Sequence, residues 1–275
     1  MKNLSVFSFV IALLSFIHVY GQTSNQAFFY SATFTPDSTN ITIKGTDYMV
    51  LWAGDNNSVF ESYYGYQLDS FQTAASSKSN NPKEVNMDAI LNTVISMKKP
   101  SYKYRIHKSW KDEQITFYQN LFFDNYVYSQ PLKMNGWKIE KEFKDVLGFK
   151  CQKASIAYAG RNFIAWFTEE IPMSDGPYVF NGLPGLILEV KDTQSQYSFE
   201  LVGIQNTAVE MDERVLPKTI ALSKNQFFLT KKALYKDVRK ALLGKPAGSA
   251  SDESIRMVQE RYDKSNNPLE LVVDK

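Results

Sequence analysis

The chain has very few of the residues that most often bind transition metals. Its 275 residues include one cysteine, Cys151, and two histidines, of which only His107 lies beyond the N-terminal segment. Zinc and copper sites are usually built from several His and Cys side chains, so we expect no metal and no other cofactor. A lone cysteine also excludes an internal disulfide. The fold must therefore be stabilised by its core, in which we expect Cys151 to be buried.

Recognisable catalytic motifs are missing as well. The chain contains no Gly-x-Ser-x-Gly segment and no glycine-rich phosphate loop. His107 falls on a predicted strand without a nucleophile motif, so we interpret it as an exposed histidine and not as a triad base. Glu169 and Glu170 would point to opposite faces of a strand and could not flank one bond. Carboxylates distant in the sequence could still converge, so enzymatic activity stays open, although no motif favours it.

No excess charge of either sign is present. The formal net charge is +2, with 22% charged residues of both signs. A protein that binds nucleic acid would gather its basic residues on one face, and this chain mostly does not, so we expect no nucleic-acid partner. Aromatic residues make up 14% of the chain, with 19 Phe and 16 Tyr. This abundance favours a strand-rich protein, because aromatic side chains suit half-buried pleated surfaces.

Long apolar runs are absent except at the N-terminus. Lys2 precedes an apolar run at 6–17, and Val19 and Gly21 occupy the −3 and −1 positions before Gln22. The pattern predicts a secretory signal peptide over 1–21 and an exported mature chain, in the periplasm or outside the cell. The run is short for a membrane span and no second one follows, so we expect no transmembrane segment in the mature chain.

Residue patterns beyond position 22 predict a single α+β domain over 22–275. Strands are expected at 27–34 and 47–53, and a period of two from 101 to 204 predicts an antiparallel meander. Small polar residues at 67–81 predict a surface loop. A helix should begin near Asn81 and carry apolar residues at helical spacing from Met87. The expected fold is a curved, half-barrel-like antiparallel sheet with a few helices packed on it.

The C-terminal part, 223–264, is expected to be helical. Ser223 and Gln226 form a capping box ahead of an amphipathic segment that ends near 242, and a second helix is expected from Ser251 to Asp263. The first segment carries its basic residues opposite its apolar stripe: Lys231, Lys232, Lys236, Arg239 and Lys240. We favour a helix docked on the sheet with a solvated basic face. Contact of helix 223–242 with an anionic membrane is the alternative that stays open.

One hexapeptide combines two glycines and a proline directly before an apolar run. It consists of Gly182, Leu183, Pro184, Gly185, Leu186 and Ile187. Proline fixes its own φ and keeps the preceding residue extended, while glycine permits positive φ or close backbone approach. With a turn at 175–177, this corner should pin 178–180 against the sheet. None of the six side chains can act as acid, base or nucleophile, so we favour a structural role over the rim of a ligand cleft.

The surrounding segment, 148–190, resembles the GLPGLI family, exported Bacteroidetes proteins of unknown function. The hexapeptide is complete, and five earlier landmarks match in order: Gly148 with Cys151, Gly160 with Arg161, Ala165 with Trp166, Ile171 with Pro172, and Gly176 with Pro177. The layout is more faintly similar to lipoprotein carriers, whose half-barrel sheet is closed by helices over an aromatic concavity. The resemblance implies export and such a fold, but no reaction.

These observations lead to an exported, non-enzymatic protein as the first hypothesis. It would bind a hydrophobic small molecule or an outer-membrane protein through an aromatic concavity. The expected lining residues are Trp110, Phe117, Trp137 and Trp166. A carboxylate-dependent hydrolase of envelope glycans or peptides is one alternative, and a structural subunit of an outer-membrane transporter is another. The sequence does not determine the ligand or the oligomeric state.

Overall fold

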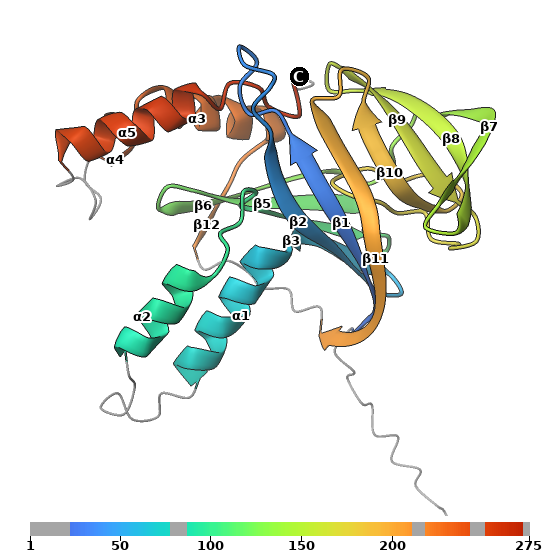
Figure 1. Cartoon of the computed structure of the whole chain (residues 1–275), viewed down its shortest axis with the longest axis horizontal. Helices are drawn as coiled ribbons and strands as arrows, with labels where there is room; N and C mark the ends of the chain where they lie inside the picture. Colours follow the sequence, from blue (N-terminus) through green and yellow to red (C-terminus); the bar gives the residue numbers. More distant parts are fainter. Residues whose placement is uncertain (1–22, 78–86, 211–217, 243–250, 272–275) are drawn as a thin grey trace, which may run out of the picture.

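The computed structural model describes residues 23–77, 87–210, 218–242 and 251–271. Within these ranges, twelve strands form one open sheet in the order β12-β6-β5-β4-β3-β2-β1-β11-β10-β9-β8-β7 (Figure 1). The strands are β1 (Thr23–Phe34), β2 (Gly45–Ala53), β3 (Asn57–Ser62), β4 (Tyr104–Ser109), β5 (Gln114–Leu121), β6 (Asp124–Pro131), β7 (Lys138–Val146), β8 (Phe149–Tyr158), β9 (Arg161–Thr168), β10 (Leu186–Asp192), β11 (Tyr197–Glu210) and β12 (Thr219–Ala221). The predicted signal peptide, 1–21, lies outside the described residues.

The sheet consists of two meanders joined through β1. Strands β2 to β6 follow one another on one side of β1, and β11 to β7 follow one another on the other. The neighbouring strands run antiparallel except for β12, which pairs with β6 in parallel. The expected class, an α+β fold with a mostly antiparallel sheet, is confirmed.

Contacts between distant strands require the sheet to be strongly curved. Strands β4 and β8 are seven positions apart in the sheet order, which would separate them by about 33 Å in a flat sheet. The Tyr178 ring nevertheless lies 5.6 Å from the ring of Tyr104 on β4. Its neighbour Phe180, 6.2 Å away, lies 5.8 Å from the ring of Tyr158 on β8. Residues 178–180 therefore lie inside the concave face, which also holds the main hydrophobic core.

The convex face is covered in part by helix α1 (Tyr63–Ser77), which corrects the loop predicted at 67–81 for its residues up to 77. Tyr63 and Tyr66 pack around Trp52 and Phe29, with the Trp52 and Tyr66 rings 4.7 Å apart. Tertiary packing of this aromatic face favours a helix despite the small polar residues that follow it. Helix α2 (Met87–Ser96) agrees with the predicted helical spacing, whereas its expected start near Asn81 lies outside the described residues.

Three C-terminal helices lie apart from α1 and α2 (Figure 1). They are α3 (Lys224–Lys236), α4 (Val238–Leu242) and α5 (Asp252–Asp263). The predicted capping box of Ser223 and Gln226 is present, and Ser251 caps α5 as expected. The first predicted helix is divided, because Asp237 leaves helical geometry between α3 and α4. None of the helices in the described ranges combines the length and apolarity that crossing a membrane requires.

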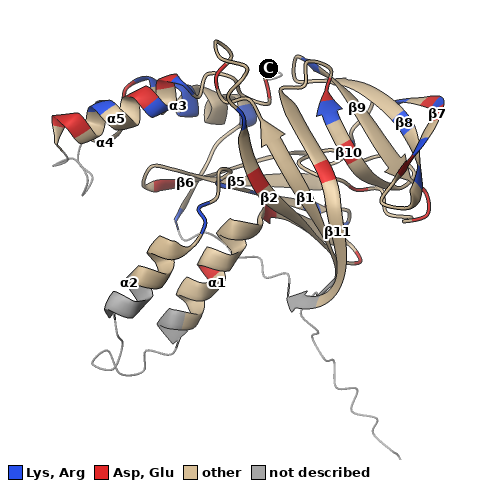
Figure 2. Cartoon of the chain, in the orientation of Figure 1, with Lys and Arg blue, Asp and Glu red and all other residues tan. Residues whose placement is uncertain are grey.

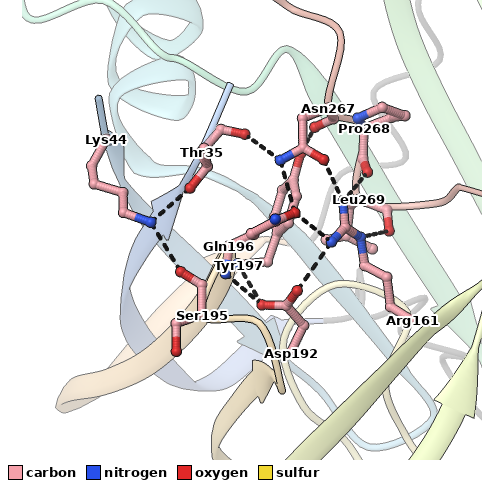
Figure 3. A network of polar contacts seen from close by, with 10 residues as sticks. All are labelled: Thr35, Lys44, Arg161, Asp192, Ser195, Gln196, Tyr197, Asn267, Pro268 and Leu269. Atoms are coloured by element: carbon pink, nitrogen blue, oxygen red, sulfur yellow. Dashed lines mark hydrogen bonds and ion pairs between the residues drawn. The ribbon is translucent and has the colours of Figure 1, made fainter. Parts of the chain in front are cut away.

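Arg161 fastens the C-terminal segment to the sheet (Figure 3). Its guanidinium, which has five N–H donors, donates to Leu269 O (2.9 Å), Asp192 Oδ2 (3.0 Å), Gln196 Oε1 (2.9 Å), Asn267 Oδ1 (2.7 Å) and Pro268 O (2.9 Å). The residue is 5% exposed. Every donor of this buried cation is therefore satisfied within the protein, which indicates a structural role and places residues 267–270 beside the concave face.

A buried ion pair holds the segment between β9 and β10 on the concave face. Lys108 Nζ, on β4, lies 2.5 Å from Asp175 Oδ1 and donates to Gly176 O at 2.6 Å. Both charged side chains are fully buried. Burial lowers the pKa of Lys108, and the attraction of Asp175 opposes that effect. The hydroxyl of Tyr30, on β1, donates a hydrogen bond to Ile187 O at 2.9 Å. Segment 169–185 is thus anchored to β4, and the strand that follows it, β10, is tied to β1.

The hexapeptide forms the corner through which this segment enters β10. Gly182 has φ +92°, which favours glycine, and a Cβ on Gly185 would lie 2.0 Å from Thr168 O at the end of β9. Leu183, Leu186 and Ile187 are buried. The expected tight corner, followed by a buried strand, is confirmed. Its glycines are needed because backbone passes over backbone where β9 and β10 begin to pair.

We predict that Gly185→Ala destabilises the protein by roughly 2–4 kcal/mol, because the added methyl group collides with backbone that cannot move aside cheaply. Gly203→Ala on β11 is the control. Its Cβ would meet no atom within 4 Å, so we expect a change within about 0.5 kcal/mol. Urea unfolding of both variants measures the difference, and equal stabilities would contradict the proposed role of the corner.

Candidate functional site

A large cavity lies between the concave face and the C-terminal helices. Its volume is about 1310 Å³, above the roughly 300–1,000 Å³ common for small-molecule sites. The walls come from β4 and β5, from α3 and α5, and from the C-terminal segment 265–271. Because Arg161 holds residues 267–270 in place, the C-terminal segment forms a fixed wall of this cavity.

Aromatic rings from the strands and from helix α3 line the cavity. They form a continuous series in which neighbouring centroids lie 4.8–5.8 Å apart, in the order Phe34, Tyr102, Tyr104, Phe117 and Phe227. Phe228 adds a ring that lies 5.4 Å from that of Phe227. Such a surface offers extensive apolar contact with little conformational entropy to lose. It suits an apolar or aromatic ligand.

Two tyrosine hydroxyls in this wall are buried without a hydrogen-bond partner among the described residues, those of Tyr102 and Tyr104. Burial raises the pKa of both phenols well above its usual value, with smaller contributions from neighbouring acidic and phenolic groups. Both hydroxyls therefore stay protonated at neutral pH. A buried polar group without a partner costs stability, and both hydroxyl oxygens lie too deep in the wall for a molecule in the cavity to reach them.

Glu270 places a buried carboxylate in the same cavity. Its Oε1 accepts hydrogen bonds from Tyr178 (2.6 Å) and Tyr158 (3.0 Å), and Lys224 Nζ lies 2.8 Å from Oε2. The residue is 3% exposed. This carboxylate is thus neutralised and hydrogen-bonded inside the protein. Its position also ties the C-terminal segment to the segment that carries Tyr178.

Lys231 differs from the other basic residues of helix α3. It was expected on the solvated face, but it is half-buried and lines the cavity. Its Nζ donates to Gln119 Oε1 at 3.3 Å, and no described carboxylate forms an ion pair with it. Burial lowers the pKa of Lys231 to about 8, against the opposing attraction of Glu270. Helical packing therefore turns one cation inward. Figure 2 shows both charge signs interspersed along the C-terminal helices.

The four aromatic residues proposed from the sequence lie in different places. Phe117 lines the cavity, whereas the three tryptophans are not among its lining residues. Trp110 packs at the edge of the main core. Trp137 donates its indole proton to Asn181 O at 2.8 Å, and Trp166 lies under the ammonium group of Lys144 at 4.7 Å. The structure therefore gathers a different set of aromatic residues around the cavity.

The remaining residues singled out in the sequence lie away from the cavity. Cys151 is fully buried on β8, as expected, and burial raises the pKa of its thiol to about 11. Glu169 and Glu170 are exposed in the turn that follows β9, not on a strand as expected. His107 is half-buried on β4.

Tyr102 and Tyr104 could have been identified as lining residues by their alternation along a strand. Phe227 and Phe228 could have been identified by their place after a helix cap. Glu270 has no local signal, because only the long-range path of the C-terminus brings it to the cavity.

Comparisons with known proteins find a similar fold and, separately, a family match over one short segment. Residues 158–189 match the family described as "Protein of unknown function (Porph_ging)", and they include the hexapeptide. No curated protein matches the chain. PNGF-II in space group P21 is similar with a TM-score of 0.50 and 11% identity, over 77% of this chain and 33% of that chain. PNGF-II in space group C2 has a TM-score of 0.49 and 12% identity, over 78% of this chain and 32% of that chain.

At this low identity the likeness to PNGF-II concerns the fold alone. The present chain spans about a third of the PNGF-II chain in space group P21.

We predict that Lys231→Met stabilises the ligand-free protein at pH 7 by about 1 kcal/mol, because it removes a poorly paired, half-buried cation. The pKa in the folded state, about 8, lies below the unfolded value near 10.4. The unfolded chain therefore binds more protons between these two values, and the contribution of Lys231 to stability rises with pH. The advantage of the variant should shrink from pH 7 to pH 10.

Thermal unfolding at both pH values tests this, with Lys232→Met, an exposed neighbour on α3, as the control. A Lys231→Met variant less stable than the wild type at pH 7 would show that the ammonium group stabilises the empty cavity.

Proposed function

We propose that the protein is exported and binds a hydrophobic ligand in the cavity beneath its C-terminal helices. The observation that carries this proposal is a volume of about 1310 Å³ with a continuous aromatic wall. A cavity of this kind is the default binding site of a protein without an evident reaction centre. The predicted signal peptide, 1–21, supports export of the chain.

The physical driving force is burial of an apolar ligand against the aromatic wall. Each methylene group removed from water contributes about 0.8 kcal/mol, so an alkyl chain of ordinary lipid length would bind well even after the cost of ordering it. Strands β4 and β5 line one side of the site and α3 and α5 line the other, so they shield part of a bound ligand from water. The fixed C-terminal segment closes a third side.

The arrangement of carboxylates favours binding over hydrolysis. Two acidic residues line the cavity, Asp263 and Glu270. Glu270 is held by Lys224 and two phenols, whereas Asp263 is exposed and accepts a hydrogen bond from Gln259 at 2.9 Å. A glycosidase needs one free general acid and a second carboxylate across the scissile bond. We therefore favour a binding protein over the hydrolase alternative.

We predict that Phe228→Ala weakens binding of the neutral apolar dye N-phenyl-1-naphthylamine about three- to tenfold, because it removes one ring of the wall. Phe143→Ala on β7 is the matched control. Its ring is 53% exposed and does not line the cavity, so binding should be unchanged. Fluorescence titration measures both dissociation constants, with thermal unfolding to confirm that each variant is folded. Wild-type protein without saturable binding, or equal loss in both variants, would overturn the proposal.

A further inference from the structure

The chemical nature of the ligand can be inferred from the charges around the cavity. Its lining contains more cations than anions: Lys103, Lys231, Lys232, Lys236 and Arg261 against Asp263 and Glu270. The charge of Glu270 is balanced locally by Lys224, at 2.8 Å. The excess of positive charge therefore acts on whatever enters the cavity, and it favours an anion over a cation.

Lys231 identifies where an anionic group would lie. Its ammonium group donates to one neutral oxygen, Gln119 Oε1 at 3.3 Å, and it has no described carboxylate partner. Other basic residues of the C-terminal helices, such as Lys232 on α3 and Lys240 on α4, are exposed to water. A half-buried cation without a counter-ion lowers the stability of the protein, because it has lost part of its hydration. A ligand that supplies an anionic group offsets this loss.

Gln119 places its side-chain amide beside the same ammonium group, on the strand side of the cavity. It is the registered partner of Tyr104 on β4, so its side chain shares the strand face that carries the aromatic rings. Lys231 and Gln119 thus bring an ammonium and an amide to one part of the cavity. Both groups carry N–H donors suited to an oxyanion.

We propose that the ligand is an anionic amphiphile, with its oxyanion head group at Lys231 and Gln119 and its alkyl chain along the aromatic wall. This inference rests on the proposed function, since it assigns the head group of a ligand in the same cavity. A carboxylate and a phosphate monoester share the required chemistry, an oxyanion that accepts charge-assisted hydrogen bonds.

The test compares probes that share a chain and differ in head group. Dissociation constants are measured by dye displacement for dodecanoate, dodecyl phosphate and dodecan-1-ol, each below its aggregation concentration. The wild type should bind both anions at least tenfold more tightly than the alcohol. Lys231→Met should lose this preference while keeping its affinity for the alcohol, and Lys231→Arg should retain it. Lys240→Met removes the same charge outside the cavity and should leave the preference unchanged.

The possible results separate the two proposals. Equal affinity of the wild type for alcohol and anions, or an anion preference that survives Lys231→Met, would overturn the head-group assignment while leaving the hydrophobic site intact. Failure of all three dodecyl compounds to bind would overturn the proposed function itself. If both anions bind more tightly than the alcohol, the tighter of the two indicates whether the natural head group is a carboxylate or a phosphate.

Discussion

The structure depends on covering the concave apolar face of a wide, open sheet. A barrel would close this face upon itself, but β12 and β7 remain separate edges. Segment 169–185 covers one part of the concave face, where Tyr178 and Phe180 bridge strands that a flat sheet would hold far apart. The C-terminal helices cover another part, where Phe227 of α3 packs against Phe117 and Tyr128. The aromatic cavity is the space between those helices and the sheet.

Buried polar groups divide into those that the protein satisfies and those that it does not. Arg161 uses all of its donors within the chain, and Lys108 has a buried carboxylate partner. Such groups fix the path of the backbone. Lys231 is different, because it is a weakly paired cation at the cavity. Among the described residues, unpartnered buried hydroxyls occur both beside the cavity, at Tyr102 and Tyr104, and away from it, at Ser58 and Tyr128. The weakly paired cation is therefore the feature that points to a ligand.

Local patterns predicted the elements of this fold better than they predicted its site. The alternation around Tyr104 placed a strand, and Ser223 with Gln226 placed a helix start, because backbone and side-chain rules act over a few residues. The same rules assigned 67–77 to a loop and Lys231 to the solvent, since both depend on packing against distant strands. Glu270 lies at the cavity only because Arg161 binds the neighbouring residues 267–269, which follow it by more than a hundred positions in the sequence. Phe117 was proposed from the sequence and lines the cavity, whereas Tyr102, Tyr104 and Phe227 carry local signals that do not show which face they share.

The most direct test of the central claim is to determine what the cavity contains in protein isolated from the cells that make it. The protein would be purified without detergent, denatured and extracted with organic solvent, and the extract analysed by mass spectrometry in parallel with the concentration of protein. The account predicts an anionic amphiphile at close to one molecule per chain. An extract with no small molecule above the level of an unrelated protein purified in the same way would contradict a ligand-binding role for the cavity.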